Sequence, residues 1–127
     1  MSNLRNPLTV VKGHGSAKEG TGHFWLQRVT AIAMIPLVLW LAFSVASLPG
    51  MSPADIREWL SHPFTSVLMI LLLLTGFYHA KLGIQMIIED YIGGHGLRTA
   101  LIIATTLGFT LLAVLGVFSV MRIAFTA

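Results

Sequence analysis

The residues of this sequence best suited to chemistry lie around His79, inside an otherwise apolar stretch. A histidine can bind a metal through either ring nitrogen, and ionisable groups at membrane depth are costly and usually functional. Five residues fall within about 40° of one line on a helical wheel: Thr75, His79, Gly83, Met86 and Asp90. A glycine one turn from the histidine leaves room for a bulky planar ligand such as haem, whose iron an imidazole can coordinate. The stripe therefore indicates a haem-facing surface.

A second interpretation of His79 needs no cofactor. A lone histidine in a membrane helix can hydrogen-bond to a neighbouring helix, and small residues such as Gly76 and Gly83 commonly allow helices to approach closely. The stripe alone leaves both interpretations open. Low-spin b-type haem usually takes two axial ligands, and the other histidines lie outside the apolar spans: His14, His23, His62 and His95. A haem at His79 would therefore need its second ligand from a partner chain.

Three apolar segments must position these residues. The chain has 127 residues, of which 55% are hydrophobic and only 10% charged, whereas about a quarter of the residues in soluble domains are charged. A membrane-spanning helix needs about 20 mostly apolar residues. The sequence therefore predicts an all-α integral membrane protein forming one domain, residues 1–127, with transmembrane helices at about 26–48, 64–92 and 98–122.

The connections between the spans carry clear start and stop signals. Ser52-Pro53-Ala54-Asp55 is typical of a helix N-terminus, with a capping serine, a proline at the first helical position and an acid in the first turn. We expect a short surface helix from Pro53 to about Leu60 in the first loop. Pro36 should kink the first span, and the glycine-rich run 93–96 should end the second.

The charges indicate an orientation. The N-terminal segment, residues 1–24, and the entry to the first span hold four of the eight basic residues, Arg5, Lys12, Lys18 and Arg28, whereas the first loop holds only Arg57. The positive-inside rule then predicts a cytoplasmic (or matrix-side) N-terminus. The net charge of +3 is scattered around the spans, so we expect no nucleic-acid partner. The absence of cysteine excludes disulfides, thiolate-bound iron–sulfur clusters and covalently attached haem from this chain.

A longer motif adds a family resemblance. The run from His79 through Gly83 to Asp90-Tyr91 resembles the His-x3-Gly-x6-Asp-Tyr signature of the smaller hydrophobic membrane anchor subunit of succinate dehydrogenase, respiratory complex II. The similarity extends over about residues 22–121 and includes the segment 27–31 at the entry to the first span. It implies that His79 is one axial ligand of the iron in a haem b shared with the larger anchor subunit, and that Asp90 and Tyr91 lie beside a ubiquinone site.

Other positions are weaker site candidates. Gly83 would pack against the haem, and Arg28, with His23 nearby, could meet a haem propionate, although an interfacial arginine needs no ligand. The Tyr91 hydroxyl can donate to a quinone carbonyl, whereas its position alone favours an aromatic-belt residue. Asp90 could orient Arg98 or a partner group, or relay protons. Lys81 lies about 160° from His79 on the wheel, where we expect it to meet a partner helix or to snorkel.

The resemblance implies a function in the tricarboxylic acid cycle and in electron transport. The chain would be a membrane anchor of succinate:ubiquinone oxidoreductase, with the larger cytochrome b anchor, the iron–sulfur subunit, the flavoprotein subunit and membrane lipid as partners. No nucleotide loop or flavin fingerprint is present, so the chain alone should not be catalytic. The alternatives are the anchor of a quinol:fumarate reductase and a cofactor-free structural or assembly protein. Without an evident transit peptide, we expect a bacterial inner membrane more than a mitochondrial one.

Overall fold

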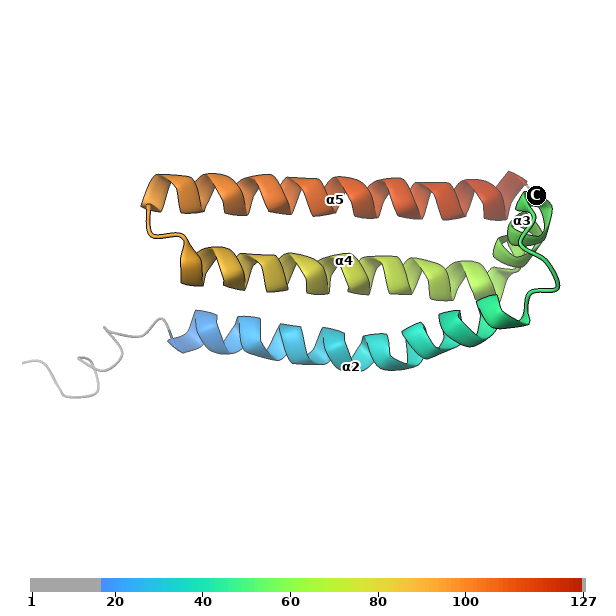
Figure 1. Cartoon of the computed structure of the whole chain (residues 1–127), viewed down its shortest axis with the longest axis horizontal. Coiled ribbons are helices and arrows are strands. Elements are labelled where there is room, and N and C mark those ends of the chain that lie inside the picture. The colour runs from blue at the N-terminus through green and yellow to red at the C-terminus, as the bar shows by residue number, and fades with distance from the viewer. Residues whose placement is uncertain (1–16, 127) are drawn as a thin grey trace, which may run out of the picture.

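The structure is a computed structural model that describes residues 17–126, and these residues form four helices (Figure 1). The helices are α2 (Ala17–Ser47), α3 (Pro53–Ser61), α4 (Pro63–Tyr91) and α5 (His95–Thr126). Three of them, α2, α4 and α5, are long and apolar enough to cross a membrane. The predicted all-α architecture, with three spans and a short helix in the first loop, is thereby confirmed.

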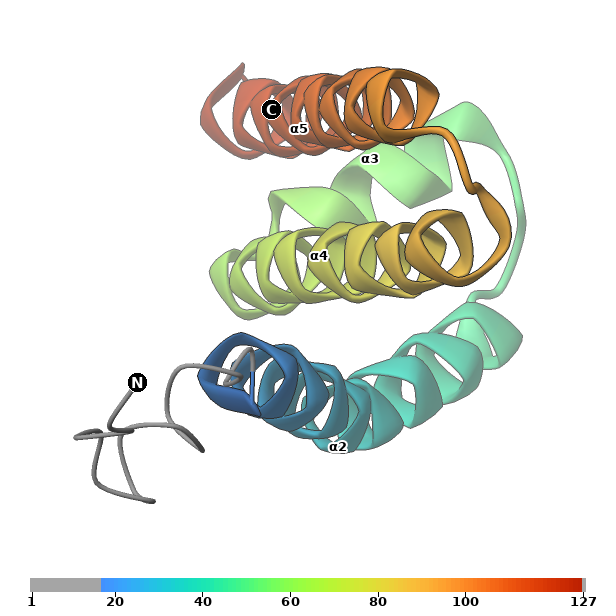
Figure 2. The same cartoon turned by 90° about the vertical axis from the view of Figure 1, so that its left-hand side faces the viewer.

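The three long helices run antiparallel in the order α2, α4, α5. Figure 2 shows α4 between the other two, and α4 is the helix that contacts both of them. The N-terminal end of α2, the C-terminal end of α4 and the start of α5 therefore share one end of the bundle, while α3 lies at the opposite end (Figure 1). A backbone in hydrocarbon must satisfy its own hydrogen bonds, which is why each span is a helix.

The first helix begins earlier than its hydropathy indicates. The span was expected from about residue 26, and α2 begins at Ala17. Hydropathy marks only the part of a helix that lies in lipid, whereas the helical hydrogen bonds can continue into the polar segment before it. The expected segment 1–24 lies largely outside the described residues, including Arg5 and Lys12. Figure 1 shows α2 curved, and Pro36 within it removes one backbone donor.

Helix α3 closes one end of the bundle. It has the expected start, because the Ser52 hydroxyl accepts from the Asp55 amide and the Asp55 carboxylate accepts from the Ser52 amide. The helix contacts α4 and α5. It also meets α2, because the rings of Trp40 and Trp59 stack with their centroids 5.8 Å apart. These contacts tie the first loop to all three spans.

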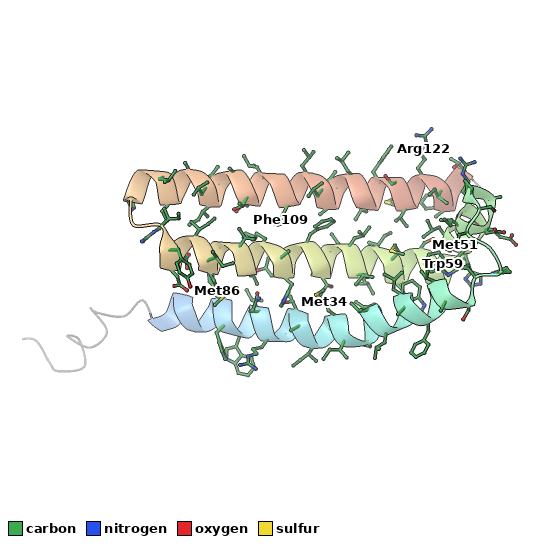
Figure 3. The ribbon with its side chains drawn as sticks, viewed as in Figure 1. Met34, Met51, Trp59, Met86, Phe109 and Arg122 are labelled. Atoms are coloured by element: carbon green, nitrogen blue, oxygen red, sulfur yellow. The ribbon has the colours of Figure 1, made fainter. Side chains whose placement is uncertain are left out.

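Little of the described chain is buried within itself. The buried hydrophobic side chains are Leu82, Ile88 and Val120, and most large apolar side chains of the spans are exposed. Figure 3 shows side chains projecting outward along the bundle, with Phe109 between α4 and α5. The α4–α5 contact includes tilted rings of Phe77 and Phe109, 6.3 Å apart. Such an outer surface suits lipid and partner helices as its surroundings.

Two glycines of α5 allow a test of how closely α4 and α5 approach each other. A Cβ at Gly116 would lie 3.1 Å from the Leu73 Cδ1 atom, whereas a Cβ at Gly108 would meet nothing within 4 Å in the described structure. We expect Gly116→Val to lower the free energy of unfolding in detergent by about 1–3 kcal/mol, the usual effect of overpacking, and so to lower the melting temperature. Gly108→Val is the control, because it makes the same glycine-to-valine change in the same helix at a position where an added Cβ meets no atom of the described residues within 4 Å. Equal melting temperatures for the two variants would contradict the close approach at Gly116.

Candidate functional site

His79 lies deep in the central helix. It comes sixteen residues after Pro63 and twelve before Tyr91, or about 24 Å and 18 Å along the helix axis at 1.5 Å per residue. The other described histidines lie close to the ends of the spans: His23, His62 and His95. Among residues 17–126, His79 is thus the histidine placed within the hydrocarbon.

The imidazole of His79 faces α2. Its Nδ1 atom lies 2.9 Å from the hydroxyl oxygen of Thr30. Its Nε2 atom lies 3.5 Å from the side-chain nitrogen of Gln27, at the limit of a hydrogen bond. Both ring nitrogens therefore have a neighbour on the adjacent helix, and the interhelical contact that the sequence left open is present.

Gly83 lies on the same face as His79, as the wheel predicted. A Cβ at Gly83 would lie 3.7 Å from the side-chain nitrogen of Gln27, so this glycine also faces α2. Figure 3 shows Met86 between α2 and α4 as well. The sequence suggested that the space beside this glycine could hold a planar ligand. Without partner chains or ligands, that space contains the Gln27 side chain. The Oε1 atom of Gln27 is buried without a hydrogen-bond partner.

The donor atoms around His79 fit a group that takes a single ligand from this chain. No group of three or more histidine, cysteine, aspartate or glutamate side chains within residues 17–126 could enclose a metal ion. A haem iron would need only one ligand from this chain, and the His79 imidazole could supply it. The unpartnered Gln27 oxygen marks a side chain whose present position leaves one of its polar atoms unsatisfied.

A second group of candidates lies at the open end of the bundle. Tyr91 ends α4 with 79% of its surface exposed, and Asp90 is exposed beside it. The guanidinium of Arg98 donates to the Ile92 carbonyl oxygen from both Nε and Nη2, at 3.0 and 2.8 Å. Arg98 therefore fixes the link between α4 and α5.

Arg28 and His23 lie on α2 at this same end. Arg28 is exposed, and its guanidinium carbon is 4.9 Å from the centre of the Phe24 ring, a cation–π distance. His23 is half-buried. The structure thus brings both residues to the end where Tyr91 lies, within about one helical turn of Gln27, without placing either against the His79 ring.

Lys81 lies on the opposite side of α4. It lines a cavity of about 380 Å³ between α4 and α5, together with Tyr78, Phe109 and other residues. Its Nζ atom is 5.7 Å from the centre of the Tyr78 ring. His79 and Lys81 therefore face different neighbouring helices, as their angular separation on the wheel indicates.

Sequence reasoning missed the two partners of His79. Gln27 and Thr30 are three residues apart and so share one face of α2, and they lie at the start of the span with Arg28 and Val29 between them. Polar side chains at that spacing could have been noted as a face directed toward the bundle. The wheel of one helix does not say which neighbour its polar face meets, so the pairing needed the structure.

Comparisons with known proteins place this arrangement in context. Residues 2–120 match the family described as succinate dehydrogenase/fumarate reductase transmembrane subunit. A succinate dehydrogenase hydrophobic membrane anchor subunit of Rickettsia bellii is 38% identical over 112 residues, which cover 87% of this chain and 88% of the relative. A protein of the same name from Paracoccus denitrificans is 30% identical over 107 residues, 84% of this chain and 83% of the relative. The similarity therefore spans the three helices and the loops between them.

Proposed function

The chain belongs to the succinate dehydrogenase/fumarate reductase transmembrane subunit family, and we propose that it is the smaller anchor of a succinate:ubiquinone oxidoreductase. It is a multi-pass membrane protein whose relatives carry the name of membrane anchor subunits. In the proposed complex it binds the larger cytochrome b anchor, and the two anchors hold the iron–sulfur and flavoprotein subunits at the membrane. Succinate oxidation takes place in those partners, and quinone reduction takes place at the anchors.

The observation that carries this proposal is the position of His79. The residue lies in the hydrocarbon and shares one helix face with Gly83. Asp90 continues that face to the end of α4, where Tyr91 follows it. In the proposed complex a ring nitrogen of His79 would bind the iron of a haem b, and the larger anchor would supply a second ligand. When bound, the haem supplies one-electron redox chemistry. In this chain, the side-chain amide of Gln27 would have to move to make room for the haem.

The proposed ubiquinone site uses the open end of α4. The phenol of Tyr91 is exposed there, and it can donate a hydrogen bond to a quinone carbonyl while its ring stays in the apolar phase. Asp90 beside it orients Arg98 or a partner group, or relays a proton from water. Arg28 and His23, at the same end, are the candidates for contact with a haem propionate.

The proposed location is a bacterial inner membrane with a cytoplasmic N-terminus. The start of α2 and the end of α4 lie at the same end of the bundle (Figure 1). By the positive-inside rule, the basic N-terminal segment favours a cytoplasmic position for this end and so for Tyr91. That is the side on which water, protons and the peripheral subunits would reach the quinone.

His79 can be tested by its effect on the spectrum of the purified complex. We expect His79→Leu to remove or shift the b-type absorption in a reduced-minus-oxidised spectrum, because an axial ligand sets the electronic state and potential of the iron. His95→Leu is the matched control, since His95 is an exposed residue at the start of α5. Co-purification of the partner subunits is measured alongside. An unchanged spectrum and midpoint potential in His79→Leu would rule out the ligand assignment.

Tyr91 can be tested with a substitution that removes only its hydroxyl. We expect Tyr91→Phe to slow quinone-dependent turnover by roughly five- to 150-fold. This corresponds to the loss of about 1–3 kcal/mol for a hydrogen bond to a buried or charged group. Succinate oxidation with an artificial acceptor that bypasses the quinone should stay near the wild-type rate. The only other tyrosine, Tyr78, provides the control Tyr78→Phe. Equal ubiquinone rates for wild type and Tyr91→Phe would leave Tyr91 as a belt residue.

A further inference from the structure

The hydroxyl of Thr30 has three acceptor-capable neighbours and one hydrogen to share among them. Its oxygen lies 2.7 Å from the Leu26 carbonyl oxygen, 3.1 Å from the Gln27 carbonyl oxygen and 2.9 Å from the Nδ1 atom of His79. The two carbonyl oxygens can only accept. Bonding to the carbonyl four residues earlier is a common arrangement for threonine in a helix. With its hydrogen directed at these carbonyls, the Thr30 oxygen is left as an acceptor toward Nδ1.

A neutral imidazole carries its proton on one ring nitrogen only. If the Thr30 oxygen accepts from Nδ1–H, the proton is on Nδ1 and the lone pair is on Nε2. The neighbour of Nε2 agrees with this, because the Gln27 side-chain nitrogen, 3.5 Å away, is a donor and would oppose a second N–H. The network therefore has one donor and one acceptor at each contact.

We propose that Thr30 is the positioning residue of the haem site, because its hydroxyl holds the Nδ1 proton of His79 and so leaves Nε2 as the nitrogen that binds iron. This inference rests on the proposed function of His79 as an axial ligand. Gln27 covers Nε2 in this chain alone and would have to move away to expose it, and its buried Oε1 atom makes no hydrogen bond that this movement would break. Helix α2 is thus part of the haem site, although it contributes no ligand from Thr30 or Gln27.

A hydrogen bond at the far nitrogen has two effects on a metal-bound imidazole. It fixes the tautomer and the orientation of the ring, and it raises the basicity of the coordinating nitrogen. A more basic ligand stabilises ferric iron relative to ferrous iron and so lowers the midpoint potential. Losing such an outer partner typically weakens metal binding by about 10- to 100-fold. Both effects can be measured without measuring enzyme activity.

The test compares valine substitutions at two threonines in the assembled complex. Thr30→Val keeps the branched shape and deletes the hydroxyl. Thr105→Val is the matched control, because the Thr105 hydroxyl makes the same local bonds on α5, 2.8 Å to Leu101 and 3.1 Å to Ile102. We expect Thr30→Val to raise the midpoint potential of the haem and to speed haem loss to excess apomyoglobin by about 10- to 100-fold. Thr105→Val should leave the midpoint potential and the rate of haem loss unchanged. Thr30→Ser, which keeps a hydroxyl, should give wild-type values of both.

Two further variants make the result decisive. Thr30→Ala also removes the hydroxyl and is used if the valine disturbs assembly, with the same expected rise in potential. A potential that is unchanged or lower in the hydroxyl-free variants, relative to Thr105→Val, would overturn the role of Thr30. His79→Leu separates this result from the proposed function. Loss of the haem spectrum in His79→Leu together with normal behaviour of Thr30→Val rejects only Thr30, whereas an intact spectrum in His79→Leu rejects the ligand itself.

Discussion

The contact between the His79 imidazole and helix α2 is the interaction on which the arrangement of this protein depends. Hydrocarbon offers no water to satisfy a buried polar ring, so an imidazole at that depth must find its partners on a neighbouring helix. Thr30 and Gln27 provide them. The contact joins α2 to α4 at mid-depth, and the antiparallel course of these two helices brings Asp90 and Tyr91 to the end of the bundle at which α2 begins.

The sequence was sufficient to predict those parts of the fold that follow from local physics. Long uncharged runs predict spans because burying a charge in lipid is unfavourable. Ser52 as the cap and Pro53 as the first helical residue predict where α3 begins, because both act within one helical turn. The sequence did not predict the stacking of Trp40 on Trp59 or the return of Arg98 to the Ile92 carbonyl. These contacts join different segments, and their relative placement follows from tertiary packing, which a hydropathy pattern does not describe.

The candidate site divides in the same way. The depth of His79 and the shared face of Gly83 follow from 1.5 Å and 100° per residue along a single helix. Which helix would face them does not follow, and the sequence therefore suggested open space for a ligand where the structure has the Gln27 side chain. Lys81 illustrates the complementary case, because its angle from His79 already implied a different neighbour, and the structure identifies that neighbour as α5.

The two ends of the bundle are closed in very different ways. At one end the chain takes a loop and the nine-residue helix α3 to connect α2 with α4, and this helix spreads over α4 and α5. At the other end only residues 92–94 connect α4 with α5. Within residues 17–126 the two ends therefore differ: α3 covers the first end, whereas the second consists of the start of α2, the end of α4, the 92–94 link and the start of α5. A protein approaching from water would therefore meet a different surface at each end of the bundle, so the two ends of the described structure are not interchangeable.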